Sequence, residues 1–395
     1  MAAFEGAANP SIAIESGYYV PEPGGKSVSD LIARRIALRP TSNHLILGGI
    51  GSGKTTQLLV THDRIESSLD NAYVRYIDVT LATDSSEIKP GVLVAIVGIT
   101  LANLMQDSKD DAVQKDIESI RKMAYGYSET VEITEMIPGQ ALSGVFRDNP
   151  VKKKVLKYRP GILLPKSSSE LIITVKRIYE LVKKEYESIV FLFDGLDRLD
   201  DSESFSQMIV SDIQEISAIG IGCVVVGSAR IMYEGFIRST LEQSVDYFEY
   251  KSCWDVENDP SAYAFFESIL KQRATEGFIE SEAIDGIIRY SGGILRDLIN
   301  ITQASIEEAY LVGDETLKVI HVDKAAETFG RGKLLGLTKS DIGILQEFAS
   351  GRLLPPSSDD EIKLLITGRI IEYVYPERRC TIHPALSPIL SLAMA

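Results

Sequence analysis

The first two thirds of the chain alternate between two patterns of apolar and polar positions. Short apolar runs, typical of strands buried on both faces, are separated by longer segments in which apolar residues recur every three or four positions, as on amphipathic helices. The short runs predict strands over residues 45–47, 73–79, 189–193, 223–226 and 245–250. The longer segments predict helices over residues 28–38, 55–68, 91–105, 168–185 and 204–216. This order predicts an α/β fold in which helices cover both faces of a parallel sheet.

Residues 125–165 interrupt this alternation. They contain prolines and glycines, show no sustained period, and predict an irregular insertion in the α/β domain. The insertion carries a basic cluster that consists of Lys152, Lys153, Lys154, Lys157 and Arg159. A second irregular stretch, also rich in proline and glycine, covers residues 17–27 and leads into the first predicted helix.

The pattern changes again after residue 335. One helix is predicted to begin at 337–341 and to end near 349, and a second covers 357–370. Two short strands follow within 371–382, around Glu377, Arg378 and Arg379, and this order is similar to a winged helix. The chain is therefore expected to divide into a leader with an entry helix (1–44), an α/β core (45–255), a small helical domain (256–333) and a winged helix (334–395).

Composition limits the classes of protein that fit. The 395 residues are enough for two or three hydrophobic cores. The N-terminus lacks the basic and apolar regions of a signal peptide, and no run approaches the ~18 apolar residues of a membrane span. We therefore expect a cytoplasmic protein that does not enter the membrane. The net charge of −15 opposes non-specific binding to a polyanion, although a local basic cluster can still contact nucleic acid.

The segment that follows the first predicted strand carries the clearest chemical signal. It fits the phosphate-binding pattern G-x-x-x-x-G-K-[ST] without a mismatch, between a strand and a helix as the mechanism requires. Its backbone N–H groups would surround phosphates, Lys54 would face the β and γ oxygens, and the Thr55 hydroxyl would reach Mg²⁺. The sequence thus predicts a nucleoside triphosphate site made by Gly48, Gly49, Ile50, Gly51, Ser52, Gly53, Lys54, Thr55 and Thr56.

A second motif places carboxylates at the end of the apolar strand 189–193. Ligands of parallel sheets bind at the carboxyl ends of the strands, so Asp194 is placed to hold Mg²⁺ opposite Thr55. A second carboxylate nearby would orient the attacking water, and Asp197 is the candidate for this role. Acidic residues after a strand are common, so this motif alone is a weak signal. It becomes specific because a phosphate loop precedes it in the same chain.

Taken together, these motifs resemble the AAA+ ATPases, and especially their STAND and KAP-type relatives, in which the Mg²⁺ strand often continues Asp-x-Leu-Asp. The resemblance implies a P-loop NTPase parallel sheet with helices on both faces, followed by a helical lid and a winged helix, with ATP as the nucleotide. The strand that ends at Ser228 and Arg230 is similar to a sensor strand, which implies contacts to the γ-phosphate region. Arg296, after the Gly292-Gly293 turn, is similar in position to the second sensor arginine of the lid.

The chain departs from this family pattern in two places. Many AAA+ ATPases place a glutamate directly after the Mg²⁺-binding aspartate, but here that position is Gly195. The identity of the catalytic base therefore stays open, and slow hydrolysis is expected. No arginine finger is assigned, since Arg238 lies at a suitable distance but also reads as an exposed helical residue. Assembly into a homo-oligomer is implied by the resemblance alone.

The function predicted from these features is an ATP-dependent switch, in which the nucleotide state moves the winged helix. A lid followed by a winged helix is also how origin-recognition initiators are organised, which implies a DNA-binding initiator or loader as the alternative. The winged helix has six basic and seven acidic residues, a net charge of −1, and its second helix begins with Asp359, Asp360 and Glu361. This charge favours a protein partner or effector over DNA. The lack of a second substrate-site signature disfavours a metabolic kinase.

Overall fold

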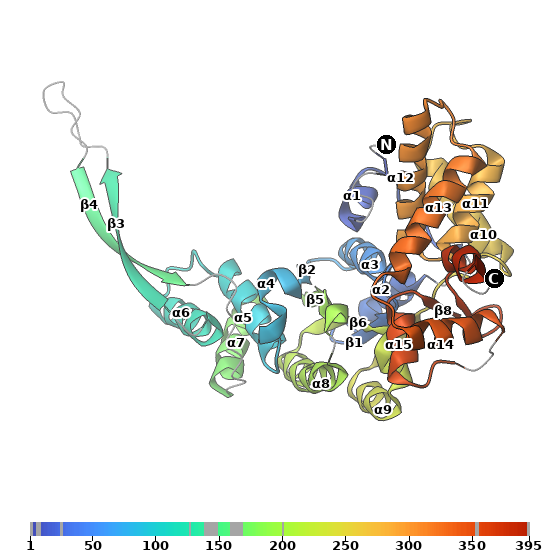
Figure 1. The fold of residues 1–395 in the computed structure, drawn as a ribbon. Helices are drawn as coiled ribbons and strands as arrows, with labels where there is room; N and C mark the ends of the chain where they lie inside the picture. Colours follow the sequence, from blue (N-terminus) through green and yellow to red (C-terminus); the bar gives the residue numbers. More distant parts are fainter. Residues whose placement is uncertain are drawn as a thin grey trace, which may run out of the picture.

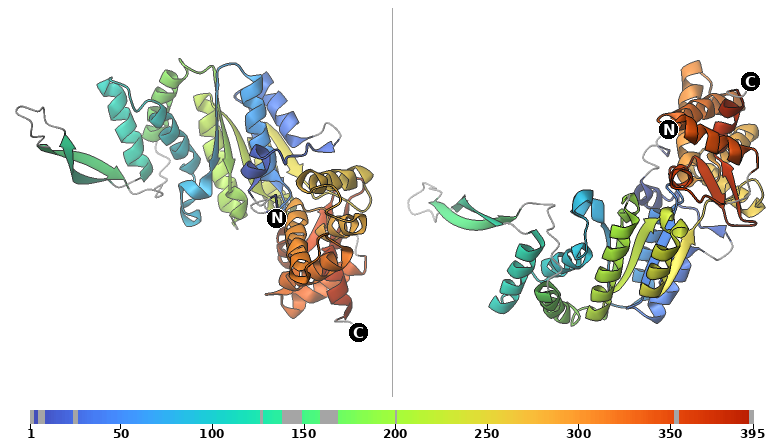
Figure 2. Two further views of the ribbon diagram at one scale, coloured as in Figure 1. Left: turned by 90° about the horizontal axis from the view of Figure 1, so that it is seen from above. Right: turned by 60° about the horizontal axis from the view of Figure 1, so that its bottom comes forward.

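The computed structural model describes residues 3–4, 9–23, 27–125, 128–137, 149–158, 169–199, 201–351 and 355–392. An α/β domain lies at the centre, with a long β-hairpin at one end and a helical lid and winged helix at the other (Figure 1). Two further views show the same opposite placement (Figure 2). Within the described residues, no helix combines the length and apolar character that crossing a membrane requires.

The α/β domain is built on a parallel sheet of five strands in the order β2-β5-β6-β1-β7. The strands are β1 (Asn43–Gly48), β2 (Ala72–Asp78), β5 (Ser188–Asp194), β6 (Gly222–Ser228) and β7 (Tyr247–Lys251). Their register pairs Gly48 with Ser228 and Asp78 with Asp194, so the carboxyl ends of the strands meet at one edge. The predicted strands and their parallel arrangement are confirmed.

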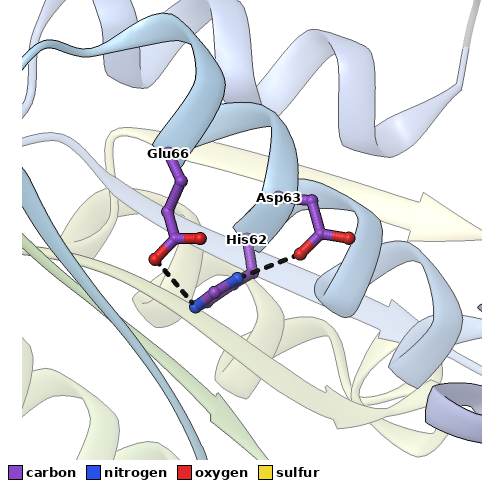
Figure 3. A group of neighbouring side chains, drawn as sticks. All are labelled: His62, Asp63 and Glu66. Atoms are coloured by element: carbon purple, nitrogen blue, oxygen red, sulfur yellow. Dashed lines mark hydrogen bonds and ion pairs between the residues drawn. The ribbon is translucent and has the colours of Figure 1, made fainter. Parts of the chain in front are cut away.

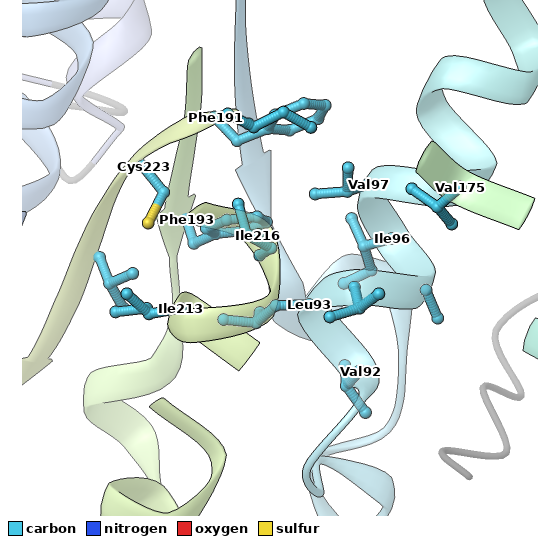
Figure 4. Close-up of a cluster of buried hydrophobic side chains, with 14 of the residues drawn as sticks. Val92, Leu93, Ile96, Val97, Val175, Phe191, Phe193, Ile213, Ile216 and Cys223 are labelled. Atoms are coloured by element: carbon cyan, nitrogen blue, oxygen red, sulfur yellow. The ribbon is translucent and has the colours of Figure 1, made fainter. Parts of the chain in front are cut away.

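Alternate residues of each strand pack against different helices. On one face, Ile46, Leu192 and Val224 join the core made with α2 (Val28–Leu38) and α3 (Lys54–Ser68). On the other face, Phe191, Phe193 and Cys223 pack with α5 (Val92–Leu104) and α8 (Ser202–Ile219) (Figure 4). Because both faces are buried, the strands read as continuous apolar runs, and the predicted three-layer fold is confirmed.

The predicted insertion, residues 125–165, is more regular than its sequence indicates. It lies between α6 (Asp111–Tyr125) and α7 (Ser169–Val182), and it contains an antiparallel hairpin of β3 (Ser128–Ile137) and β4 (Asn149–Tyr158). The prediction of irregular structure is therefore wrong for both strands. These strands form a separate two-stranded sheet outside the central sheet. Residues 138–148 and 159–168, which include Arg159, lie outside the described part of the chain.

The register of the hairpin places part of the basic cluster opposite acidic residues. Glu129 pairs with Lys157, and Glu132 pairs with Lys154. Opposite charges in directly paired positions stabilise an antiparallel ladder. Lys152 and Lys153 are instead opposite Thr134 and Ile133, so the register gives a glutamate to only two of the four lysines of β4.

The C-terminal part consists of a lid and a winged helix, as predicted. The lid is made of α10 (Pro260–Arg273), α11 (Ser281–Ser291), α12 (Leu295–Val312) and α13 (Val319–Leu334). The winged helix is made of α14 (Lys339–Ala349), α15 (Asp359–Ile366), β8 (Ile370–Tyr373) and β9 (Arg379–Ile382), followed by η5 (Pro384–Leu386) and α16 (Ser387–Leu392). The predicted helix over 357–370 is too long, because the chain leaves the helix at Thr367 and turns at Gly368 with a φ of 67°.

A short helix, α1 (Pro10–Glu15), lies in the leader. The other short helices lie in the connections of the α/β domain and are α4 (Val79–Ala82), η2 (Ser85–Glu87), η3 (Leu196–Arg198), η4 (Ala229–Tyr233) and α9 (Gly235–Ser244).

Asp212 of α8 fixes the start of α5. Its two carboxylate oxygens accept the backbone N–H groups of Gly91 at 2.6 Å and Leu93 at 2.8 Å. The side chain is fully buried, and this burial raises the pKa of Asp212 to about 7 despite the lowering effect of the two hydrogen bonds. A helix N-terminus without such a partner would leave buried N–H groups unsatisfied. The two hydrogen bonds of Asp212 therefore join the start of α5 to α8.

We expect the parent protein to gain stability relative to Asp212→Asn as the pH falls from about 8 to about 5. The folded state keeps a proton on Asp212 below pH of about 7, whereas the unfolded chain takes it up only near a pKa of about 3.9. The contribution of this protonation to the free energy of unfolding is therefore present at low pH and is lost as the pH rises through about 7. The free energy of unfolding changes by up to about 1.4 kcal/mol per pH unit. Denaturant unfolding of both proteins across this range measures it. A difference in free energy of unfolding that does not vary with pH would contradict the assignment.

Candidate nucleotide site

One cavity of about 540 Å³ lies between the carboxyl edge of the sheet and the first turn of α12. The phosphate loop and the start of α3 form its floor, and the lid and the N-terminal leader form the opposite walls. Of the predicted site residues, its lining includes Gly51, Gly53, Lys54, Thr55, Thr56, Asp194, Asp197 and Arg296.

The phosphate loop has the geometry that its glycines allow. The chain passes from β1 to α3 through Gly51 and Gly53, whose φ angles of 80° and 95° lie in the left-handed region. Lys54 is 5% exposed, and its Nζ donates to the carbonyl oxygens of Gly48 at 3.0 Å and Gly49 at 2.8 Å. The first residues of α3 line the cavity. The N–H groups and the dipole at the N-terminus of a helix favour an anion there.

Asp194 is a buried carboxylate at the end of β5. Its Oδ1 accepts the N–H of Gly195 at 2.8 Å, and its Oδ2 accepts the hydroxyl of Tyr76 at 3.0 Å. Burial, followed by the charge of Asp194, raises the pKa of Tyr76, so this hydroxyl remains a donor. The hydroxyl of Thr55 and the carboxylate of Asp194 are both hard oxygen donors at the cavity wall, and this donor set fits Mg²⁺.

Asp197 faces the phosphate loop. Its Oδ2 lies 2.9 Å from Lys54 Nζ, and its side chain is 21% exposed. The structure therefore brings together Lys54, Asp194 and Asp197, as the sequence predicts. Asp200, the next carboxylate along the chain, lies outside the described residues.

The two sensor-strand candidates lie elsewhere. The hydroxyl of Ser228 accepts the N–H of Arg230 and caps η4. The guanidinium of Arg230 pairs with Glu234 at 2.7 Å and with Asp359 of the winged helix at 3.0 Å. Neither residue belongs to the lining of the cavity. Arg238, also considered for a phosphate contact, pairs with Glu242 on its own helix.

The lid rests directly on the phosphate loop. The N–H of Arg296 donates to the carbonyl of Gly51 at 3.4 Å. A Cβ on Gly51 would lie 2.8 Å from Arg296 Cβ and 2.9 Å from Ile294 Cγ2, and one on Gly53 would lie 2.9 Å from Leu295 Cδ1. The lid therefore requires a glycine at residue 51 in addition to the turn, whereas at residue 53 the end of the Leu295 side chain would have to move.

Sequence analysis missed the residues that close the cavity from the leader and from α10. They are Tyr18, Tyr19, Val20, Glu22, Phe265, Ile269 and Arg273. Glu22 forms a buried ion pair with Lys251 at 2.7 Å, which fastens the leader beside the phosphate loop. The adjacent tyrosines in a stretch rich in proline and glycine were the available signal, since such residues need a partner surface to be ordered.

The winged helix forms hydrogen bonds and ion pairs with both the lid and the core. Tyr373 of β8 donates to the carbonyl of Gly292 at 3.0 Å, directly before α12. Asp297, next to Arg296, contacts His383 Nε2 and Lys333 Nζ, each at 3.1 Å. Burial acts to raise the pKa of Asp297, but the hydrogen bond to His383 and the charge of Lys333 outweigh it and hold this pKa below its usual value.

The wing arginines are also paired. Arg379 makes two contacts of 2.8 Å with the carboxylate of Asp255 and one of 2.9 Å with Glu257. Arg378 lies 2.8 Å from Glu372, a buried carboxylate that also accepts the hydroxyl of Tyr250 at 3.3 Å. The basic residues that sequence analysis placed on the wing for DNA therefore face acidic groups of the same chain.

A separate cluster on α3 combines His62, Asp63 and Glu66 (Figure 3). Asp63 lies 3.2 Å from the Nδ1 of the histidine, whereas Glu66 lies 3.6 Å from its Nε2. Each ring nitrogen faces a different carboxylate, and both carboxylates are exposed. The arrangement is that of surface ion pairs along a helix rather than of ligands that converge on one metal ion.

This architecture is the AAA+ P-loop NTPase fold, followed by a helical lid and a winged helix. The ORC1 protein of Aeropyrum pernix, solved in complex with DNA, is similar over 97% of this chain and 96% of its own, with a TM-score of 0.50 and 12% identity. The ORC2 protein of the same organism, in ADPNP and ADP complexes, is similar over 95% and 96%, with a TM-score of 0.47 and 13% identity.

The RuvB Holliday junction branch migration motor of Thermotoga maritima is similar over 89% of each chain, with a TM-score of 0.43 and 15% identity. No model of a protein family matches the sequence, and no curated protein matches it significantly. At these identities the likeness concerns the fold.

We expect Gly51→Ala to weaken nucleotide binding by about tenfold or more, because a left-handed φ and a lid contact of 2.8 Å both oppose the added methyl group. Gly49→Ala is the matched control, since a Cβ there meets no atom within 4 Å. Calorimetric titration with ATP measures both variants. Equal losses in the two would show that the lid contact is not what limits the site.

Proposed function

We propose that this protein is an ATP-binding and ATP-hydrolysing switch. The observation that carries the proposal is the composition of one cavity, in which the phosphate loop and Asp194 face Arg296 of the lid. A triphosphate in this cavity would contact the core and the lid at the same time. Binding energy that depends on the γ-phosphate would therefore act on the angle between them.

Different residues of the chain would bind the phosphates and the metal ion. Lys54 and the N–H groups at the start of α3 hold the phosphates, and Thr55 and Asp194 would hold Mg²⁺. When bound, the ion would neutralise charge on the β and γ oxygens. Arg296 supplies a second positive charge from the lid. ATP, rather than another nucleoside triphosphate, follows from the resemblance to AAA+ ATPases.

The same cavity wall is connected to the winged helix. Arg296 is followed by Asp297, which binds His383 and Lys333, so a movement of the first turn of α12 is transmitted through a buried ion pair. Gly49 and Ile50 of the phosphate loop also line a small pocket together with Leu365 and Ile371 of the winged helix. The winged helix is therefore the output element in this proposal, and its position is what the nucleotide controls.

What the winged helix engages defines the two forms of the proposal. The first is a STAND-like regulator that binds a protein partner or effector in the cytoplasm, with homo-oligomerisation as a further property. The net charge of −1 and the paired arginines of the wing support a protein partner. Ser228 would act only through the η4 turn, and Arg230 through its ion pair with Asp359.

The second candidate is a DNA-binding ATPase of the initiator or loader kind. Its support is the similarity in fold to an origin-recognition protein that was solved in complex with DNA, and this similarity favours the initiator over the STAND-like form. DNA would be contacted by the wing, after release of Arg378 and Arg379, and by the lysines of β4.

Arg296→Ala should abolish the difference between the ATP and ADP arrangements while ADP still binds. An arginine that meets a terminal phosphate in one state supplies on the order of 1.5 to 3 kcal/mol, which shifts the equilibrium about tenfold or more. Crosslinking or small-angle scattering between the core and residues 337–392 measures the arrangement. Arg289→Ala on α11 is the matched control, and Lys54→Ala, which removes the charge facing the β and γ phosphates, should bind neither nucleotide. Identical arrangements of the parent protein with ATP and ADP would refute the switch.

A salt titration of DNA binding separates the two candidates. The initiator form predicts that log affinity falls with log salt by about 0.9 per phosphate contacted. Lys153→Gln and Lys154→Gln on β4 should each reduce this slope by about one contact, and the control Lys176→Gln on α7 should not. Absence of binding at low salt, with and without ATP, would leave the protein partner as the function of the winged helix.

A further inference from the structure

The position of the missing glutamate after Asp194 is filled from another strand. Gly195 has a φ of 84°, and a Cβ on it would lie 2.6 Å from Asp78 Oδ1 and 3.0 Å from Thr80 Cγ2. A side chain at residue 195 is therefore excluded by a carboxylate of the neighbouring strand.

Asp78 is well placed for chemistry at the cavity. It is the last residue of β2, it pairs in register with Asp194, and it lines the cavity that contains Lys54 and Asp194. Its Oδ1 accepts both the N–H of Thr80 at 3.0 Å and the Thr80 hydroxyl at 2.6 Å. Because both bonds go to one oxygen, the carboxylate is oriented while Oδ2 keeps its capacity to accept a proton.

The neighbouring charges support this orientation. Arg198, which lines the same cavity, donates from Nη1 to the Thr80 hydroxyl at 3.4 Å. The Thr80 hydroxyl thus accepts from Arg198 and donates to the carboxylate of Asp78. This chain of contacts joins the end of β2 to η3, directly after Asp194.

The other three carboxylates of the cavity wall have different partners. Glu22 forms the buried ion pair with Lys251. Asp194 accepts from Tyr76 and Gly195, and its geometry suits a ligand of Mg²⁺. Asp197 lies 2.9 Å from Lys54 Nζ, so its charge balances that of the lysine. Among the described acidic residues of the cavity wall, Asp78 is the one that is neither paired to a cation nor assigned to Mg²⁺.

We propose that Asp78 is the catalytic base of the hydrolysis, whose identity the sequence left open with Asp197 as the candidate for orienting the water; this inference rests on the proposed function. The oxygen of a water molecule attacks the γ-phosphorus, and the bond from this phosphorus to the β,γ-bridging oxygen breaks. ADP leaves with the electron pair of that bond. The proton of the water passes to Asp78 Oδ2 and then to the released phosphate, which restores the carboxylate.

Asp78 also caps the short helix α4, and the test must separate this role from catalysis. Asparagine and serine both cap a helix about as well as aspartate, so Asp78→Asn and Asp78→Ser keep the cap and remove the base. Asp84→Asn is the matched control, because Asp84 makes the same pair of bonds to Ser86 at the start of η2, on the exposed surface.

The experiment measures ATP affinity, single-turnover hydrolysis and the identity of the bound nucleotide. We expect Asp78→Asn to bind ATP within about threefold of the parent, to turn over roughly 10² times more slowly, and to retain ATP rather than ADP. Asp84→Asn should behave as the parent does, and Asp197→Asn should keep more turnover than Asp78→Asn.

Three outcomes would overturn the assignment. Unchanged turnover in Asp78→Asn together with loss of turnover in Asp197→Asn would give the role to Asp197 and leave the proposed function intact. Failure of both Asp78→Asn and Asp78→Ser to bind ATP would make Asp78 a structural cap. A parent protein that neither binds nor hydrolyses ATP would refute the proposed function itself, and the assignment with it.

Discussion

The contact between the phosphate loop and the first turn of α12 is the constraint on which the rest of the site depends. Gly51 and Gly53 admit Ile294, Leu295 and Arg296 at distances that any Cβ would block. This close approach sets the width of the cavity, because one wall is the loop itself and the other is the helix that rests on it. It also joins the lid to the core, since the N–H of Arg296 donates to a backbone carbonyl of the phosphate loop.

Several charges of the winged helix are paired within the chain. Asp359 contacts Arg230 of the core, Arg379 contacts Asp255, and Arg378 contacts Glu372 of the winged helix itself. The carboxylates of Asp255 and Glu372 are buried, and removal of the arginine that pairs with either one would leave a desolvated charge behind. A ligand that binds the two wing arginines would therefore have to replace these contacts.

The sequence predicted the parts of this protein that are local. The strand, the phosphate loop and the following helix are adjacent residues, and the apolar run before Asp194 is enough to place that carboxylate at the edge of the sheet. The contacts that could not be predicted are those between segments that are far apart in the sequence. Arg230 contacts Asp359, the leader reaches the cavity, and Asp78 comes from a different strand than Asp194. The hairpin of β3 and β4 was also missed; its two strands form a sheet of their own, apart from the central sheet.

The ion pair between Glu22 and Lys251 has a consequence for the limits of the smallest active fragment. Both side chains are almost fully buried, at 5% and 7% exposure. A shortened chain that begins at the entry helix would leave Lys251 inside the protein without its anion, at a cost of about 3 to 5 kcal/mol. The same truncation would open one wall of the cavity. The lining of the proposed nucleotide cavity is thus discontinuous in sequence: the leader contributes to it as the phosphate loop does.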